Sequence, residues 1–376
     1  MLKIAIIGFG KRANDVWKTI DTFHACTVAA VADPRAEELK QERGEEFPDC
    51  AWYTDAEEML NKETVDGVLI GTRCNLHTKY ALLVAKYNLP LFLEKPVSIT
   101  EEELAQLETI PHMEEKTVVS FPLRRAKLVD IVKDFIDRGV LGELSQVQAY
   151  NNVKYARGYY HKWYRDESIT GGLFLQKSTH DLDYINYVLN RGIPKTICAM
   201  ESKQVFKGDR PANLSCADCP EKESCPESVQ NIAEYDPKYA YPPAKCAFAV
   251  DTGNHDSGTI LMQYPDGLHV VYTQNFVARK SAGKRGARFI GYKGTVEFDF
   301  NTKSVTYIDH MSDRVDHISV ETTGSHSGGD KNLAKNFIDI MLGKDVSRAP
   351  LSQGILSAKL CLAAKKSAET KTFIEL

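Results

Sequence analysis

The N-terminal third of the chain alternates short apolar runs with segments whose apolar residues recur at helical spacing. The apolar runs cover residues 3–7, 28–32, 65–70, 91–93 and 117–121. Apolar runs of this length that end at breaker residues are typical of buried parallel strands. Because helical segments separate the runs, the pattern predicts a doubly wound parallel sheet, which is an α/β fold.

Capping residues mark the ends of several predicted helices in this part of the chain. Thr54 is a candidate N-cap for a helix over residues 56–61. Thr100 and Glu103 have the spacing of a capping box at the start of another helix. A helix over residues 78–87 is expected to end before the strand at 91–93.

The rest of the chain has a different pattern, in which one strand follows another across short polar turns. Candidate strands cover residues 145–151, 196–204, 246–251, 258–264, 268–276, 288–291, 295–299, 304–308 and 315–320. Helices are expected over 128–137, after Asp330 and over 352–368. Consecutive strands with short connections predict an α+β domain built on an open, mainly antiparallel sheet.

Length and composition suit a two-domain protein with a small-molecule partner. The chain has 376 residues, of which 43% are hydrophobic, and this is enough for two cores. We expect domains at 1–122 and 123–376, with a cysteine-rich insertion at 207–245. A net charge of −4 argues against nucleic acid, and no apolar run approaches the length of a membrane span. Nine cysteines without an export signal predict a reducing, cytoplasmic location.

A glycine-rich turn follows the first predicted strand. Residues 8–13 spell G-F-G-K-R-A at the start of a predicted helix, and Asp33 ends the next strand 23 residues beyond Gly10. Glycines here allow backbone N–H groups to approach a pyrophosphate, and an acidic residue at this distance suits the ribose hydroxyls. An ordinary strand–turn–helix is the alternative, and the two features together favour a dinucleotide site. Asp33 predicts a preference for NAD, which Arg35 would weaken enough to admit NADP.

Two charged residues follow the strand over residues 91–93. Glu94 and Lys95 precede Pro96, which cannot continue a sheet ladder. The carboxyl ends of strands in open α/β sheets are where ligands bind. Taken alone, the pair would be two solvated charges at a strand end.

The ordered motifs GFGKRA, VADP, GTRCNLH and EKP resemble the Gfo/Idh/MocA family, named for glucose–fructose oxidoreductase and inositol dehydrogenase. Arg73 stands where the family often has proline, while Asn75 and His77 occupy matching places. The resemblance implies a Rossmann domain and an open-sheet domain that binds substrate and supports a homo-oligomer, a dimer or tetramer. It also implies cofactor contacts from the following residues: Gly8, Phe9, Gly10, Lys11, Arg12, Asp33, Arg35, Thr72, Asn75, His77, Glu94 and Lys95.

A second motif lies in the segment from Gly171 to Leu189. On a regular α-helix, Gln176, His180 and Asp183 would share one face. The segment resembles the family pattern G-G-G-x-x-x-D-x-x-x-H-x-x-D, with Gln176 in place of the first acidic residue. The resemblance implies that Lys95 and His180 are catalytic, and that Gln176, Lys177 and Asp183 bind substrate. A structural histidine is the alternative reading of His180.

An aromatic segment precedes this motif. It includes Tyr160, Trp163 and Arg165, which we predict to bind substrate, because aromatic faces with polar tips suit sugar rings. A flap that packs on its own domain would have the same composition.

The insertion contains Cys216, Cys219 and Cys225, and Cys246 follows it. Four thiolates can close a tetrahedral zinc site, which would have a structural role because no ligand position stays open. An iron–sulfur cluster is the second possibility, since two of these cysteines precede proline, and free buried thiols are the third.

These features predict an NAD(P)-dependent oxidoreductase that moves hydride between nicotinamide and a hydroxyl carbon of a sugar, cyclitol or glycoside. Two alternatives stay open, a glycoside-cleaving enzyme without net NAD turnover and a sensor that binds dinucleotide and sugar. His326 to Asp330 spell H-S-G-G-D, which resembles a family subset acting on glycosides and other sugars. A loop leading into a helix would also explain that segment.

Overall fold

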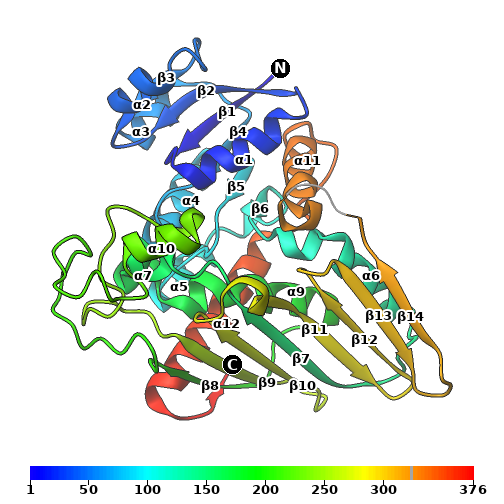
Figure 1. The fold of residues 1–376 in the computed structure, drawn as a ribbon. Coiled ribbons are helices and arrows are strands. Elements are labelled where there is room, and N and C mark those ends of the chain that lie inside the picture. The colour runs from blue at the N-terminus through cyan, green and yellow to red at the C-terminus, as the bar shows by residue number, and fades with distance from the viewer. Residues whose placement is uncertain (322–324) are drawn as a thin grey trace. The chain divides into compact units, whose positions relative to one another are not determined.

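The structure is a computed structural model that describes residues 1–321 and 325–376. The chain forms two compact units (Figure 1). The first unit comprises Met1–Asp130, Thr179–Tyr187 and Thr322–Lys359, and the second comprises Ile131–Ser178, Val188–Glu321 and Leu360–Leu376. Three helices therefore run from one unit into the other, and the domain boundary expected near residue 122 stays a prediction.

The first unit contains a six-stranded sheet of order β3-β2-β1-β4-β5-β6, and all of its pairings are parallel. Its strands are β1 (Leu2–Ile7), β2 (Cys26–Ala32), β3 (Ala51–Tyr53), β4 (Gly67–Ile70), β5 (Leu91–Leu93) and β6 (Thr117–Val119). The predicted parallel sheet is confirmed. The three-residue edge strand β3 was missed, because so short a segment has no apolar period of its own.

The helices of the first unit connect these strands or follow them. They are α1 (Lys11–Asp21), α2 (Ala36–Arg43), α3 (Ala56–Lys62), α4 (His77–Lys86), α5 (Glu101–Leu107) and α11 (Gly329–Met341). The prediction that Thr54 caps α3 was wrong, because the side chain of Asp55 accepts the N–H of Glu58. Thr100 does cap α5, since its side chain accepts the N–H of Glu103 at 3.1 Å.

The second unit contains a nine-stranded sheet of order β14-β13-β12-β11-β7-β10-β9-β8-β15. Its strands are β7 (Leu144–Asn152), β8 (Thr196–Ser202), β9 (Ser257–Gln263), β10 (His269–Asn275), β11 (Lys284–Gly291), β12 (Gly294–Asp299), β13 (Ser304–Asp309), β14 (Val315–Ser319) and β15 (Ile374–Glu375). Only the pairing of β10 with β7 is parallel among these described strands, so the predicted mainly antiparallel sheet is confirmed.

One predicted strand of this unit was wrong. Residues 246–251 form turns, with one isolated bridge between Ala249 and Arg210. The apolar residues of this segment pack into a core instead: Ala247 is buried among aromatic side chains. An apolar run of this length predicts burial reliably, but it does not by itself distinguish a strand from a buried loop.

The helices of this unit are α7 (Gly158–His161), α8 (Glu167–Thr170) and α10 (Val229–Tyr235). The helices α6 (Lys127–Asp137), α9 (Thr179–Leu189) and α12 (Leu351–Thr370) belong partly to each unit. Phe174–Ser178 form one turn of π-helix, η5, directly before α9. Gln176 and His180 therefore do not share one face as i and i+4 residues of a regular α-helix would, because a π turn contains an additional residue.

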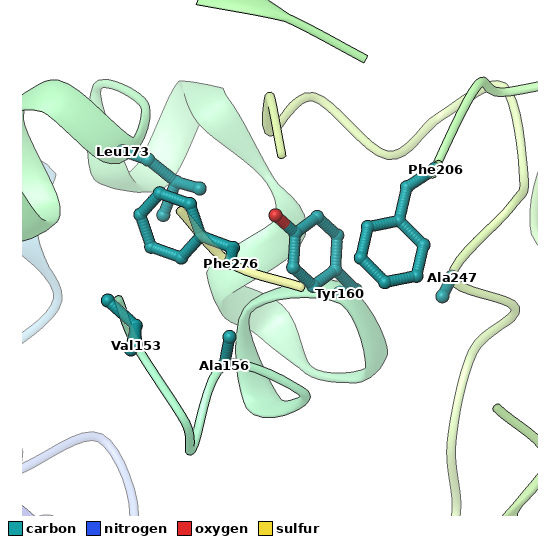
Figure 2. Close-up of a cluster of buried hydrophobic side chains, with 7 residues drawn as sticks. All are labelled: Val153, Ala156, Tyr160, Leu173, Phe206, Ala247 and Phe276. Carbon is teal, nitrogen blue, oxygen red and sulfur yellow. The ribbon is translucent and has the colours of Figure 1, made fainter. Parts of the chain in front are cut away.

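A cluster of buried side chains joins the aromatic segment to both ends of the insertion (Figure 2). The rings of Tyr160 and Phe206 lie 4.1 Å apart between their centroids, and Ala247 and Phe276 pack in the same cluster. Burial of aromatic surface of this size contributes strongly to stability. The ends of the insertion are thus anchored in the core of the second unit. None of the described helices is long and apolar enough to cross a membrane.

Candidate active site

The glycine-rich turn after β1 leaves space for a ligand at one position only. Gly8 has a φ of +79°, and a Cβ added there would lie 2.6 Å from the side chain of Thr72. At Gly10, which precedes α1, an added Cβ would meet nothing within 4 Å. Packing thus requires the first glycine, whereas the second borders open space next to backbone N–H groups. This is the arrangement that accepts a pyrophosphate.

Asp33 lies at the end of β2 and is 7% exposed. Its carboxylate accepts the backbone N–H of Phe9 at 3.0 Å and that of Arg35 at 2.9 Å. These bonds fix the turn and leave other lone pairs for hydroxyl donors. The side chain of Phe9 is buried and packs on the ring of Phe47, so only its backbone is placed to contact a cofactor.

An open pocket of about 300 Å³ lies beside this turn, between α1 and α2. Four of its side chains are basic, namely Lys11, Lys18, Arg35 and Arg43, and two are acidic, namely Glu42 and Glu46. Arg35 lies 3.7 Å from Asp33, which partly offsets the negative charge at the end of β2. The pocket therefore suits a ligand with negative charge.

His77 lies beneath the two loops that follow β4 and β5. It is 1% exposed, and its Nδ1 lies 2.7 Å from the carbonyl oxygen of Pro96, while its Nε2 lies 3.3 Å from that of Thr72. Burial lowers the pKa of His77, so the imidazole is neutral. His77 supports the backbone around Lys95, and Asn75, two residues before it, is half-buried.

Glu94 is bound on the inner side of the turn after β5. Its Oε1 accepts Nε of Arg12 at 2.7 Å and the hydroxyl of Ser120 at 2.8 Å. A second nitrogen of Arg12 lies 3.0 Å from Asp330 at the start of α11. Burial would lower the pKa of Arg12, but the two carboxylates raise it above its ordinary value. Lys95 is half-buried, so solvent reaches more of it than of the buried Glu94.

His180 belongs to the first unit together with Lys95 and the glycine-rich turn. It is 6% exposed, and its ring centroid lies 6.1 Å from that of Phe121 and 6.1 Å from that of His326. His180, Lys95 and the glycine-rich turn, which are far apart in the sequence, thus belong to one compact unit.

Asp183 forms a buried ion pair with Arg124. Both oxygens of Asp183 bind the guanidinium, with Oδ2 at 2.9 Å from Nε. Burial raises the pKa of Asp183 to about 6, although Arg124 lowers it. This bidentate pair favours a structural role for Asp183, and substrate binding by it stays a prediction.

Lys177 forms a polar group with two tyrosines in the second unit. It is 5% exposed, and its Nζ donates to the hydroxyl of Tyr155 and to that of Tyr159 at 3.3 Å. Burial raises the pKa of Tyr159 well above its ordinary value. Gln176 is also buried on η5. The ammonium of Lys177 can donate to a polyol hydroxyl, and the two phenol hydroxyls can donate or accept.

The other predicted substrate residues have mainly structural contacts. Tyr160 is fully buried and its hydroxyl donates to the carbonyl of His255 at 2.7 Å. Arg165 donates to Asp251 and Thr252, both at 2.7 Å, and Trp163 stacks on Tyr164. These contacts favour the flap alternative for Tyr160 and Arg165, whose assignment to substrate binding stays a prediction.

Three cysteines of the insertion and Cys246, which follows it, line one small cavity. A short backbone pairing brings two of them together: the N–H of Cys216 donates to Ala244 at 2.9 Å, and that of Cys246 donates to Leu214 at 2.7 Å. Burial raises the pKa of Cys216 to about 11, and the other three thiols add to this effect. No three metal-ligating side chains of residues 1–321 and 325–376 stand in a metal-binding arrangement, so the predicted zinc site is not shown.

Sequence reasoning missed two residues that build this site, and it missed the side-chain partners of a third. Arg12 was predicted to contact the cofactor, which stays a prediction, and it also joins Glu94 to Asp330. Ser120 and Arg124 were not considered, although both follow the last strand of the parallel sheet. That position at the carboxyl end of β6 was the only signal that could have identified them.

Two profiles of one family together match almost the whole chain. The first, described as "Oxidoreductase family, NAD-binding Rossmann fold", matches residues 2–121. The second, described as "Oxidoreductase family, C-terminal alpha/beta domain", matches residues 133–376. The chain belongs to the Gfo/Idh/MocA oxidoreductase family. This membership confirms the resemblance, the fold class and the prediction of an NAD-binding oxidoreductase.

Relatives of this Gfo/Idh/MocA oxidoreductase include enzymes of cyclitol metabolism. YteT of Bacillus subtilis (strain 168), a candidate oxidoreductase, is 25% identical over 397 residues, which cover 93% of this chain and 90% of YteT. The myo-inositol 2-dehydrogenase of Thermotoga maritima is 24% identical over 205 residues, which cover 51% of this chain and 56% of that enzyme. The match to the second relative therefore includes little more than half of either protein.

Solved structures with the same fold cover the whole chain. Levoglucosan dehydrogenase, in complex with NADH and levoglucosan, has a TM-score of 0.76 at 17% identity and covers 100% of this chain and 99% of its own. The myo-inositol 2-dehydrogenase from Lactobacillus plantarum has a TM-score of 0.72 at 17% identity, with the same coverage. At these identities the likeness establishes the fold.

Proposed function

We propose that this protein oxidises a hydroxyl carbon of a sugar, cyclitol or glycoside with NAD. One observation carries the proposal: the glycine-rich turn, Lys95 and His180 belong to one compact unit. Within it, Arg12 of that turn donates a hydrogen bond to Glu94, the residue before Lys95. The names of relatives support the substrate class, because three of them are inositol dehydrogenases.

The residues around Gly10 fit the pyrophosphate of a dinucleotide, since the added Cβ there would enter open space. Bound NAD would supply the hydride acceptor. Asp33 would accept the ribose hydroxyls with the lone pairs that its backbone bonds leave unused. Thr72 and Asn75 would line the same crevice, because both follow β4.

Lys95 and His180 would handle the proton that leaves the substrate hydroxyl. Oxidation of an alcohol needs a base within hydrogen-bond reach, and such a base contributes a factor of roughly 10² to 10⁴. The ordinary pKa of histidine lies near neutrality, which suits this role. Glu94 would orient the turn, because its Oε1 is occupied by Arg12 and Ser120. Lys177 and the two tyrosines beside it would bind substrate hydroxyls.

The test is NADH absorbance during incubation with NAD and a panel of inositols, aldoses and anhydrosugars. Net NADH formation with at least one compound supports the proposal. Release of an aglycone from aryl glycosides with no net NADH would instead establish the glycoside-cleaving alternative. Tight binding of NAD without any turnover would favour the sensor.

We further propose a preference for NAD over NADP. Asp33 would repel a 2′-phosphate, while Arg35 at 3.7 Å and the other basic side chains of the nearby pocket reduce that repulsion. Titration of the protein with both dinucleotides should give a smaller dissociation constant for NAD than for NADP. Equal affinities would show that Asp33 does not contact the ribose.

We also propose a structural zinc ion at Cys216, Cys219, Cys225 and Cys246. All four line one cavity, and burial raises the pKa of Cys216, Cys225 and Cys246, while the neighbouring backbone N–H groups of Val229, Glu227 and Phe248 lower it. Such N–H groups stabilise thiolate ligands. The side chains would have to turn toward the ion, because they do not stand at ligand distances without it.

Elemental analysis of the protein purified under reducing conditions tests the zinc site. We expect about one zinc ion per chain, lost in Cys219→Ser and Cys225→Ser and kept in the control Cys198→Ser, which alters a half-buried cysteine of β8. An iron–sulfur absorption band, or a protein with no metal, would overturn it. The homo-oligomer and the cytoplasmic location stay predictions.

A further inference from the structure

The H-S-G-G-D segment before α11 has a geometry that its two glycines make possible. Gly328 has a φ of +87°, and a Cβ added to Gly329 would lie 1.8 Å from the carbonyl oxygen of Pro122. The start of α11 therefore packs directly against backbone of the turn that follows β6. No larger residue could bring Asp330 to that position without moving the turn.

Two residues of the segment hold an uncommon backbone conformation. His326 has a φ of 48° and Ser327 a φ of 54°, both in the left-handed region that residues with a Cβ seldom adopt. Such conformations persist where surrounding contacts determine them, and they are concentrated at functional sites. The contact that holds His326 is a bond between its Nδ1 and Oδ2 of Asp330 at 2.6 Å.

Asp330 connects this histidine to the candidate active site. It is 9% exposed, and its other oxygen accepts Arg12 at 3.0 Å. The same guanidinium binds Glu94 at 2.7 Å, directly before Lys95. A carboxylate can only accept, so Nδ1 of His326 carries a hydrogen, and in the neutral imidazole Nε2 is then an acceptor. One line of hydrogen bonds thus runs from the turn after β5 to His326.

The ring of His326 lies beside the ring of His180. Their centroids are 6.1 Å apart and their planes differ by 33°. All residues of this arrangement belong to the first unit. In the family pattern an acidic residue stands four positions before the histidine, but here that residue is Gln176. The Asp330–His326 pair supplies a carboxylate-bound imidazole beside the ring of His180.

We infer that His326, held by Asp330 and Arg12, is a positioning residue that orients His180 for proton transfer. This inference rests on the proposed function. It explains why the segment has a histidine at a strained position and an aspartate shared by two partners. It also explains why both glycines are present: Gly328 allows the turn, and Gly329 allows the close approach to Pro122.

Two substitutions separate this role from a purely structural one. In His326→Asn the side-chain amide can still donate to Asp330, but the second ring nitrogen is lost. We expect kcat to fall at least about tenfold, with unchanged NAD affinity and thermal stability. Asp330→Asn should lower kcat similarly, and it should also shift the pH profile, because Arg12, Glu94 and His180 surround the pair.

His24→Asn is the matched control. His24 is an exposed histidine of the same unit with a φ of 52°, so the substitution repeats the chemical change in a similar backbone conformation. It should leave kcat unchanged. Wild-type kcat in His326→Asn would overturn the inference alone. Absence of any turnover by the wild-type protein, with either dinucleotide or with aryl glycosides, would overturn the proposed function and this inference together.

Discussion

At the scale of single residues, the surroundings assign different roles to neighbouring polar groups. Glu94 and Lys95 are adjacent in sequence, but Glu94 is 5% exposed and bound to Arg12 and Ser120, while Lys95 is partly exposed. A carboxylate fixed by two donors keeps its geometry during a reaction, whereas an accessible amine can exchange a proton with a ligand. Hence Lys95 rather than Glu94 is expected to touch the substrate.

Lys95→Ala and His180→Ala should each lower kcat by roughly 10² to 10⁴, because each removes a group that handles the proton. Binding of NAD, measured by fluorescence titration, should remain. Lys86→Ala is the control, since Lys86 is an exposed lysine near the end of α4. Near-normal turnover of Lys95→Ala on the true substrate would contradict the central assignment.

At the scale of elements, the two glycines of the turn between β1 and α1 have different roles. Gly8 is required for folding, and Gly10 is expected to serve binding. The two glycines look alike in the sequence, but a Cβ at Gly8 would lie 2.6 Å from Thr72, while a Cβ at Gly10 would meet nothing within 4 Å. The sequence motif alone does not show which glycine is required by packing and which borders open space, because Gly8 and Gly10 satisfy the same pattern.

Gly10→Ala should therefore leave the thermal unfolding midpoint nearly unchanged and weaken NAD binding at least about tenfold, because the methyl group would occupy space next to the pyrophosphate. Gly8→Ala should instead destabilise the fold, since both its positive φ and its contact with Thr72 oppose a side chain. Calorimetry and NAD titration of both variants check this pair. Full NAD affinity in a folded Gly10→Ala would show that the dinucleotide does not use this turn.

The π-helix before α9 is an element that sequence patterns did not predict. A regular α-helix would place Gln176 and His180 on one face, yet Phe174–Ser178 form a π turn and α9 begins at Thr179. A π turn differs from an α turn by one residue, and apolar spacing over so few residues cannot reveal it. Such turns are frequent at functional sites, and this one contains Gln176 and Lys177.

At the scale of the whole molecule, buried His77 makes stability depend on pH. Burial lowers its pKa from 6.5 in the folded protein, so below that pH the unfolded chain binds more protons than the folded one. The free energy of unfolding should therefore be highest above about pH 6.5 and fall as the pH decreases through that value. Thermal unfolding of the wild-type protein between about pH 5 and pH 8 measures this dependence.

His77→Gln should flatten that dependence, because glutamine does not titrate. It should also lower stability at neutral pH by about 1 to 3 kcal/mol, since the bond to Pro96 at 2.7 Å would be weakened or lost. His112→Gln is a suitable control, as His112 is exposed and its Nε2 lies 3.2 Å from a carbonyl oxygen of α4. An unchanged pH dependence in His77→Gln would assign the effect to other groups.

The sequence by itself determined the two sheet types, most element positions and the family, because these depend on local periodicity and on motifs of few residues. The sequence also predicted that Lys95 and His180 are catalytic and that the four cysteines bind a metal ion. Only the tertiary structure decided how these residues are partnered. The bond of Arg12 to Asp330, the Arg124–Asp183 pair and the meeting of His326 with His180 join residues far apart in the chain. No local pattern encodes such contacts, because they arise when separate elements pack together.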